Sequence, residues 1–577
     1  MEIGAANHMN DFPPTKLSGV EALKARSDLL RGDLTDELAA GGSQVSEDGY
    51  NLLKFHGSYE QYDRDTATAL KQRGEEKDYS FMVRVRMPGG SLTSAQYLAL
   101  DALADRHANA TLRITTRQGI QFHYVPKHEL KPAIVAINAA LLTTLAACGD
   151  VARNVMTTPA PLRDAVHARL EADAHRLSAH LLPKTRAYHE IFLDGEKVDL
   201  PESEPLYGAT YLPRKFKISL TVPEDNTVDV LSNDLGLIAL FEGETLTGYN
   251  IAVGGGQGMT HNRADTFPAV AQVVGFVEAA KLLAAVEAVI SLQRDHGDRS
   301  DRRRARLKYV VHDRGLDWVR STLIEQYGLA LLPARPMPEF LVPDHLGWHA
   351  QGDGLWWLGV PVPSGRIADQ SGVSLRSALR AVMAETGADP VMTPQQDILL
   401  TNIRPEQRDE VDAILQYHHV VPASDLTPLA RWTLACPALP TCGLALTEAE
   451  RVRGPIVADV QAALDGAGLG DQRISLRITG CPNGCARSYT GDIGLVGRIP
   501  GQYALFVGGD FAGTVLSMKL IEKLPVARIG ATLAPLFAAW GQVRAADPAR
   551  DLGFGDWCRT VGEAALLALL GREEKAA

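Results

Sequence analysis

The sequence predicts an internally duplicated α+β protein with a pseudo-two-fold axis. Its 577 residues are too many for one hydrophobic core, so several domains are expected. Residues 81–142 contain FMVRVRMPGG, a helical stretch, TLRITTRQGIQFHYV and a second helix, and residues 355–416 follow the same order from LWWLGVPVPSG through DPVMTPQQDILLTNI. The segments that come next also correspond, because NDLGLIAL with GYNIAVGG (233–255) resembles GDIGLVGR with QYALFVGG (491–509). Four matched blocks in the order A-B-A′-B′ favour a duplication over two α+β domains that merely share common motifs.

The individual elements follow from hydrophobic periodicity. Alternating apolar residues predict strands within 81–87 and 110–124. Thr93 and Gln96 have the spacing of a capping box at the start of the intervening helix. In the second copy, one helical face is apolar, made by Leu375, Leu379, Val382 and Met383.

These elements predict five segments. The first 75 residues are polar and weakly patterned, and are interpreted as an arm that docks a partner. The expected segments are the arm (1–75), a first half (76–150), a first lobe (151–344), a second half (345–425) and a second lobe (426–577).

Composition excludes several classes of protein. Acidic residues outnumber basic ones, 69 to 58, which argues against nucleic-acid binding. Charged or polar residues interrupt the apolar stretches, so no membrane segment is expected, and the N-terminus shows no secretory signal. A cytoplasmic protein is therefore expected. Six cysteines are too few for a disulfide scaffold in so long a chain, and four of them are clustered, which points to metal or redox chemistry.

The clustered cysteines form two motifs in Pro/Gly-rich loops. Cys436 and Cys442 are spaced C-x5-C, and Cys481 and Cys485 are spaced C-x3-C. Structural zinc sites prefer tighter knuckles, whereas iron–sulfur clusters accept varied spacing. A structural zinc site and unliganded buried cysteines remain alternatives. The isolated cysteines, Cys148 and Cys558, are interpreted as core residues.

Five segments together identify a family. TTRQGIQFH, RNVMTTPAP, YLPRKFKISL, CPALPTC and TGCPNGCARSYTGDIGLVGR resemble the sirohaem-containing sulfite/nitrite reductases, most of all their assimilatory, NADPH-dependent sulfite-reducing branch. The resemblance implies two ferredoxin-like halves and two larger lobes that hold sirohaem and a [4Fe–4S] cluster. It implies that the cluster ligands are Cys436, Cys442, Cys481 and Cys485. It also implies that Cys485 is the axial ligand of the sirohaem iron.

The resemblance extends to residues that would bind the sirohaem carboxylates. By period two, Arg113, Thr115 and Arg117 share one face of a strand over 111–117, where a solvated hairpin face is the alternative. The residues implied are Arg113, Arg117, Gln121, His123, Arg214, Asn483 and Arg487. For His123 alone, a satisfied core histidine is the alternative. The basic run at 301–308 gives Arg306 and Lys308 as further candidates.

Four cations would bind the substrate, namely Arg84, Arg153, Lys215 and Lys217. Lys215 and Lys217 point the same way on a strand, an arrangement that is costly when buried unless an anion lies between them. A lysine-protected edge strand is the alternative. Nitrite-reducing relatives typically carry RKxN where this chain has RKFK, so we expect six-electron reduction of sulfite to sulfide over reduction of nitrite to ammonia.

The electrons must come from a partner, because no NADPH or flavin site is apparent in this chain. The resemblance implies a flavoprotein reductase, with ferredoxin as the other possible donor. A non-catalytic Fe–S electron carrier is the alternative from another functional class.

Overall fold

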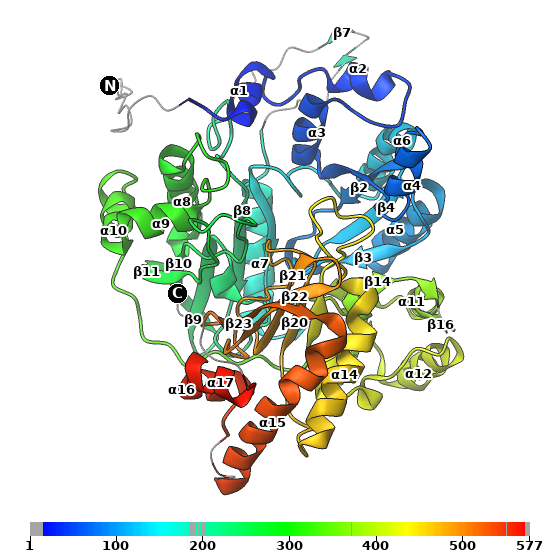
Figure 1. Cartoon of the computed structure of the whole chain (residues 1–577). Helices are drawn as coiled ribbons and strands as arrows, with labels where there is room; N and C mark the ends of the chain where they lie inside the picture. The colour runs from blue at the N-terminus through cyan, green and yellow to red at the C-terminus, as the bar shows by residue number, and fades with distance from the viewer. Residues whose placement is uncertain are drawn as a thin grey trace.

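The computed structural model describes residues 16–184 and 204–571 apart from residues 371, 548 and 550, together with two short strands, β6 (Phe192–Leu193) and β7 (Glu196–Lys197). Helices and sheets are mixed throughout, as the α+β prediction requires (Figure 1). None of the described helices has the length and apolar character needed to cross a membrane.

The two halves have the same topology. Each sheet begins with two neighbouring strands, followed by a helix, two further strands and a second helix. In the first half these are β1 (Ser58–Tyr62), β2 (Tyr79–Arg84), α5 (Ser94–His107), β3 (Leu112–Ile114), β4 (Ile120–Val125) and α6 (Lys127–Ala139). In the second they are β12 (Gly347–Ala350), β13 (Trp356–Val360), α11 (Leu375–Thr386), β17 (Asp389–Met392), β18 (Ile398–Ile403) and α12 (Arg408–Tyr417). The strand orders β1-β2-β4-β3 and β12-β13-β18-β17 are equivalent, which confirms the duplication.

The two lobes repeat each other as well. The first lobe has a five-stranded sheet of β5 (Ala152–Met156), β8 (Phe216–Thr221), β9 (Leu235–Glu242), β10 (Thr245–Val253) and β11 (Gln272–Glu278). The second has β19 (Thr433–Ala435), β20 (Leu476–Thr479), β21 (Ile493–Ile499), β22 (Gln502–Val507) and β23 (Met518–Pro525). In both sheets the first two pairings are parallel and the last two antiparallel.

Equivalent helices accompany the two lobe sheets. The first lobe carries α7 (Ala165–His180), α8 (Leu282–His296), α9 (Leu307–Arg314) and α10 (Leu316–Glu325). The second carries α14 (Arg453–Gly466), α15 (Ile529–Ala546), α16 (Phe554–Val561) and α17 (Glu563–Leu569). Short elements complete the chain, namely α13 (Pro428–Arg431), β14 (Arg366–Ile367), β15 (Asp369–Gln370) and β16 (Val373–Ser374). β14 pairs with β3, so the second half contributes a strand to the sheet of the first.

Two glutamines make equivalent contacts in the two copies. The Gln118 amide donates to the carbonyl of Gly89 and accepts from the backbone N–H of Thr157, at 2.8 and 3.0 Å. The Gln396 amide donates to the carbonyl of Ser364 and accepts from the N–H of Ala435, at 3.1 and 3.3 Å. Each glutamine thus connects its half to the first strand of the following lobe, so the two copies correspond residue by residue.

The described part of the N-terminal arm, residues 16–75, packs against the rest of the protein. It forms α1 (Gly19–Arg26), α2 (Leu34–Ala39), α3 (Glu47–Leu53) and α4 (Ala67–Gln72), and its β1 pairs with β2 in the first sheet. Its leucines are buried in the main core, including Leu34, Leu52 and Leu53. The expected boundary at residue 75 stays a prediction. It divides the two copies unequally, because it places β1 in the arm, whereas the equivalent strand β12 lies inside the expected second half. Burial of the arm removes apolar surface from water and fixes its position.

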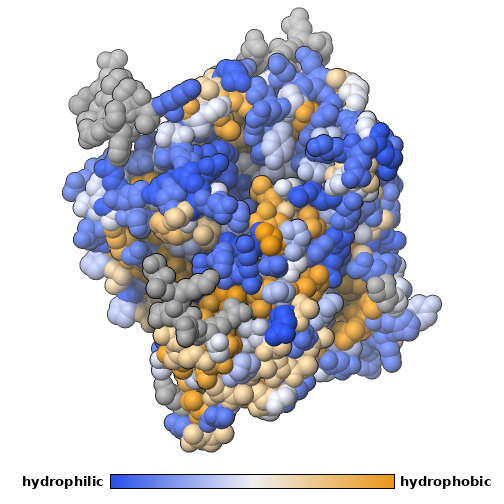
Figure 2. Space-filling model, viewed as in Figure 1, coloured by the Kyte–Doolittle hydropathy of each residue, from blue (hydrophilic) through white to orange (hydrophobic). Residues whose placement is uncertain are grey.

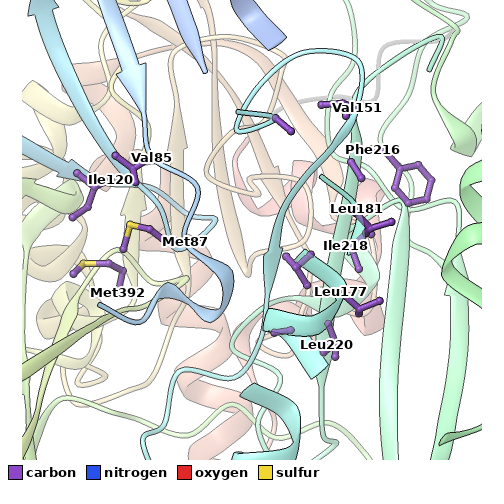
Figure 3. Close-up of a cluster of buried hydrophobic side chains, with 14 of the residues drawn as sticks. Val85, Met87, Ile120, Val151, Leu177, Leu181, Phe216, Ile218, Leu220 and Met392 are labelled. Carbon is purple, nitrogen blue, oxygen red and sulfur yellow. The ribbon is translucent and has the colours of Figure 1, made fainter. Parts of the chain in front are cut away.

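Apolar packing joins the halves to the first lobe. One core cluster runs through the arm, both halves and the first lobe, while the second lobe has a core of its own. In Figure 3, Met87 and Met392 from the two halves lie near each other, and Phe216, Ile218 and Leu220 of β8 pack with Leu177 and Leu181 from the α7 region. In Figure 2, pale and orange residues gather over α14 and α15, so this end of the second lobe is the more apolar part of the face shown.

Candidate cofactor and anion site

The four clustered cysteines lie in two loops of the second lobe, each directly after a strand. Cys436 and Cys442 follow β19, and Cys481 and Cys485 follow β20. These strands are parallel neighbours, so their carboxyl ends meet at one edge of the sheet. The equivalent strands of the first lobe, β5 and β8, are followed by no cysteine. The duplicated lobes have therefore diverged, and only the second carries a thiol-rich edge.

Backbone N–H groups point at three of these sulfurs. Gly480 N–H donates to the Sγ of Cys436 at 3.3 Å, and the backbone N–H groups of Leu444 and Ala445 lower the pKa of the Cys442 thiol against the effect of burial. The Asn483 backbone and side-chain amide both donate to Cys481, the latter at 3.5 Å. Such donors stabilise thiolate charge, and they are the arrangement that iron–sulfur ligands require.

The four thiols lie close enough to act on one another electrostatically, and Cys485 acts on each of the other three. Yet within the described part of the chain no three His, Cys, Asp or Glu side chains converge closely enough for one metal ion. Burial raises the pKa of Cys481 to about 12, so this thiol ionises at neutral pH only when a metal centre binds it. The donor set of four thiols with backbone N–H donors fits a [4Fe–4S] cluster.

A glycine-rich loop at 254–259 supports the Cys481–Cys485 segment. Met259 N–H donates to the carbonyl of Pro482, and Tyr489 N–H donates to Gln257. Lys308 donates to the carbonyls of Gly256, Gly258 and Phe267. Arg306 forms a bidentate pair with Asp234 at 3.1 and 2.6 Å. The structure therefore places these two predicted cations against the loop and Asp234.

Four cations from three strand regions gather beside the cysteine edge, and we call them the cation cluster: Arg84, Arg153, Lys215 and Lys217. Burial, with Arg214, Arg153 and Lys217 beside it, lowers the pKa of Lys215 well below its ordinary value. Burial together with Arg117 and Arg306 lowers the pKa of Lys217 to about 7, while Cys485 acts in the opposite direction. Lys217 therefore lies within electrostatic reach of the predicted bridging thiolate.

No acidic side chain forms an ion pair with a member of this cluster in the part of the chain that the structure describes. Asp234 acts on Lys217, and Asp150 on Arg153, only from beyond ion-pair distance. Neither lysine has a side-chain hydrogen bond or ion pair among residues 16–184 and 204–571. Arg84 donates to the Sγ of Cys148 at 2.8 Å, and Arg153 donates to the Tyr59 hydroxyl at 3.3 Å. Buried like charges without a counterion are unfavourable, and an anion bound between them relieves that cost. The cluster is therefore suited to an oxyanion.

The structure adds residues that sequence reasoning missed. Tyr59 is in contact with Arg153, and burial raises its pKa. Burial, with Arg302 and other arginines nearby, lowers the pKa of Lys54 to about 7. Asp150 lies beside Lys24, Arg214 and Arg302. Tyr59 and Lys54 lie in residues 52–65, LLKFHGSYEQYDRD. The polar residues that alternate with aromatic ones in this stretch were the sequence signal that could have identified them.

The expected sirohaem ligands have different surroundings. Both ring nitrogens of buried His123 and the Nε of Arg117 lack hydrogen-bond partners within the described residues. Unpartnered buried donors of this kind fit a carboxylate-rich cofactor. Gln121 donates to the sulfur of Met82, and Arg214 lies 3.8 Å from Asp150. Arg487 lies 2.8 Å from Asp229 and donates to Pro394 and Gln395.

One expectation about these residues is wrong. β3 ends at Ile114, and residues after it turn back toward β4, so Arg113 and Arg117 do not share a strand face. Arg113 pairs with Glu450 at 3.0 Å and donates to Ala435, near Cys436, whereas Arg117 donates to Asn233 and to the carbonyl of Asn154. The period-two argument failed because the tight turn with Gln118 at positive φ interrupts the extended backbone.

Comparison with known proteins identifies the family that has this fold. The model of the nitrite/sulfite reductase ferredoxin-like half domain matches residues 73–140 and 349–417, which are the two halves, and the nitrite and sulphite reductase 4Fe-4S domain matches residues 172–331. Together these matches span just over half of the chain. The chain belongs to the nitrite and sulfite reductase family. Family membership implies a [4Fe–4S] cluster and sirohaem, and the cysteine edge fits the first of these. The cysteines themselves lie outside the 172–331 match, in the second lobe with its equivalent topology.

Individual relatives extend over nearly the whole chain. The chain is 47% identical to the sulfite reductase [NADPH] hemoprotein beta-component of Myxococcus xanthus, over 95% of this chain and 97% of that protein. It is 43% identical to the sulfite reductase [ferredoxin] of Synechococcus elongatus, over 96% of this chain and 91% of that protein. The solved structure of Mycobacterium tuberculosis NirA matches with a TM-score of 0.77 at 25% identity, covering 95% of this chain and 97% of NirA. This likeness confirms the duplicated fold.

Proposed function

We propose that the protein is the haemoprotein of a sulfite reductase and reduces sulfite to sulfide with six electrons. One observation carries the proposal: within the described residues no acidic side chain forms an ion pair with the cation cluster, and Lys217 of this cluster lies within electrostatic reach of Cys485. Relatives named as sulfite reductases, at 43–47% identity over most of the chain, support it.

Separate sets of residues in the chain would bind the cluster and the sirohaem. Cys436, Cys442, Cys481 and Cys485 would hold the cluster, and Cys485 would also ligate the sirohaem iron. Arg113, Arg117, Gln121, His123, Arg214, Asn483 and Arg487 would bind the sirohaem carboxylates. When bound, the two coupled metal centres supply electrons one at a time to the sulfur of the substrate. Arg306 and Lys308 support the loop beside this site through Asp234 and the 256–258 carbonyls.

The cation cluster would bind and orient the oxyanion. Arg84 and Arg153, held through Cys148 and Tyr59, direct fixed N–H donors at the anion, which favours departure of negatively charged oxygen. Lys217, with a pKa of about 7, can hold or release a proton at its Nζ near neutral pH and is suited to protonating that oxygen. Lys217 lies near the start of β8 and Lys215 directly precedes the strand, and the two lysines act on each other electrostatically, so one anion would interact with both ammonium groups.

The electron donor is part of the proposal. Among the relatives, one is named for NADPH and another for ferredoxin. We favour a flavoprotein reductase that takes electrons from NADPH, because relatives at 47% identity are named for NADPH and the relative named for ferredoxin is 43% identical, and we keep ferredoxin as the second candidate. We also propose a cytoplasmic location for this enzyme.

Steady-state kinetics test the substrate assignment. Purified holoenzyme is supplied with a reduced viologen dye, and sulfite and nitrite turnover are compared with sulfide assayed as product. A higher kcat/KM for sulfite with full conversion to sulfide supports the proposal. A clear preference for nitrite gives the family's other activity, and no turnover of either anion by cofactor-loaded protein overturns the assignment.

A further inference from the structure

A small pocket that is open to solvent lies between the residues around 343–346, the second half and the second lobe. We call it the second pocket. Its lining includes Asp344, His345, Gln395, Asp397, Arg431 and Trp432. None of these residues is among those proposed to bind the cofactors or the substrate, and one of them, Gln395, accepts a hydrogen bond from Arg487. The duplication shows what the pocket corresponds to in the other copy.

Backbone contacts fix the correspondence between the two lobes. Lys217 N–H donates to Asp234 at 3.0 Å, and Ser475 N–H donates to Asp492 at 2.8 Å in the same position of the other sheet. Two residues earlier, Lys215 therefore corresponds to Arg473. The paired glutamines match Thr157 with Ala435, so Arg153 in ARNVMTTPAP corresponds to Arg431 in ARWTLACPALP.

The halves correspond in the same way. The carbonyl of Gly57 accepts from Arg84 N–H, and Gly347 is the register partner of Gly359. Both Gly57 and Gly347 have positive φ, 79° and 86°. Three residues before these glycines, Lys54 corresponds to Asp344. The second pocket is therefore the counterpart of the cation cluster, with two of its cations retained as arginine and a lysine beside them replaced by an acid.

Asp344 occupies the place of an anion in this counterpart. Its carboxylate pairs with the Arg431 guanidinium. Burial lowers the pKa of Arg473 to about 10, and Asp344 is the first group that opposes this shift, so the carboxylate also lies within reach of Arg473. Arg473 is held in place by Trp432 and Phe511, whose ring centroids lie 4.3 and 3.7 Å from its guanidinium carbon. The side chain of Asp344 is 36% exposed, so the pocket is open to solvent at this point.

We propose that the second pocket is a closed oxyanion site, in which the Asp344 carboxylate takes the position of the bound anion between Arg431 and Arg473. Removing that carboxylate opens a site for a small oxyanion such as sulfate. The chain then has one open and one internally closed copy of the same site. This proposal rests on the proposed function, in which Arg153 and Lys215 bind the substrate. Sulfate binding at the second pocket is measured without turnover, so its failure can be told apart from failure of the proposed function.

The other charged groups around the pocket set the conditions of the test. His345 pairs with Asp225 at 2.9 Å and is not free to bind an anion. Asp397 accepts from Val362 N–H at 2.9 Å, and burial raises its pKa to about 7. At pH 6 this carboxyl group is largely protonated and repels an anion little, so binding is measured at that pH.

The experiment compares sulfate binding by wild-type holoenzyme and the Asp344→Ala variant. Sulfate is titrated at constant ionic strength against chloride, and stoichiometry is read by calorimetry and by the thermal unfolding midpoint. We expect Asp344→Ala to bind one more sulfate per chain than wild type, with a saturable rise in its unfolding midpoint. Asp344→Ala/Arg431→Met should lose that sulfate. Glu75→Ala, which breaks an exposed pair with Arg73, is the matched control and should behave as wild type.

Each other outcome overturns the proposal. Equal stoichiometry in wild type and Asp344→Ala would do so, as would an extra sulfate that survives Arg431→Met. Viologen-linked sulfite turnover by Asp344→Ala should stay at the wild-type level. Loss of turnover without an extra bound sulfate would contradict the proposal and show that Asp344 stabilises the fold instead. Where the alanine variant is insoluble, Asp344→Asn replaces it. If both are insoluble, recovery of soluble protein in sulfate but not in chloride supports the proposal, and equal loss in both salts contradicts it.

Discussion

The buried carboxylate of Asp150 is expected to be the main electrostatic support of three cations next to the cation cluster, namely Lys24, Arg214 and Arg302. Its side chain is 1% exposed, lies 3.8 Å from Lys24 and Arg214, and accepts two hydrogen bonds from Arg302 at 2.5 and 2.9 Å. Asp150→Asn keeps the shape and removes the charge. At an effective dielectric constant of 20, the interaction with Lys24 alone is about 4 kcal/mol. Breaking a buried ion pair on one side typically costs roughly 3–5 kcal/mol after relaxation, and we expect a loss of that size.

The measurement is urea unfolding of the holoenzyme followed by circular dichroism, with the free energy taken only where a single transition is seen. The matched control is Asp353→Asn, because Asp353 also lies 3.8 Å from an arginine, Arg163, but is 34% exposed. The control should lose less than about 1 kcal/mol, as exposed pairs do. If Asp150→Asn loses no more than the control, the assignment of Asp150 as the electrostatic support is wrong.

The pH dependence gives a second check on the same residue. Burial opposes ionisation of Asp150, but Arg302, Lys24 and Arg214 outweigh burial and hold its pKa well below the ordinary value. A carboxyl whose pKa is depressed by folding stabilises the folded state above its unfolded pKa, and that contribution is lost as the pH falls toward the folded pKa. The difference between wild type and Asp150→Asn should therefore be constant from about pH 5 to 8 and shrink in stronger acid. A difference that grew on acidification would contradict this explanation.

Three further predictions concern the site and the arm. Lys217→Asn should lower kcat/KM for sulfite at least tenfold and leave kcat/KM for nitrite unchanged, since nitrite is smaller and less charged. An unchanged ratio of the two kcat/KM values would show that Lys217 does not select the substrate. Cys485→Ser should lose the cluster signal in electron paramagnetic resonance and the matching iron content, whereas Cys558→Ser, at a buried cysteine of the second-lobe core, should keep both; equal iron in the two variants would refute the ligand assignment. A chain lacking residues 1–60 should lose activity with the viologen dye as well as with the natural reductase, because the arm contributes buried leucines and most of β1 to the fold; full activity with the dye alone would make the arm a docking element.

The sequence alone determined the repeat and the chemistry. Apolar alternation and matched motifs are local properties, so the order of strands and helices in both copies could be predicted, and the capping box of Thr93 and Gln96 is present. The cysteine spacing is also local, and the four cysteines were assigned to one centre before any fold was known. Because the two copies match in sequence, the equivalence of Gln118 and Gln396 could also be predicted from the sequence.

The tertiary structure decided which groups meet. Arg113 pairs with Glu450, which lies 337 residues away, and no local pattern specifies such a partner. Tyr59 contacts Arg153 of the cation cluster, and Lys54 lies near it, because β1 pairs with β2, and the polar sequence of the arm did not predict that pairing. Asp344 meets Arg431 only where a half packs against a lobe. Charges act through space over a few ångströms, so their partners depend on the packing of distant segments rather than on neighbouring residues in the chain.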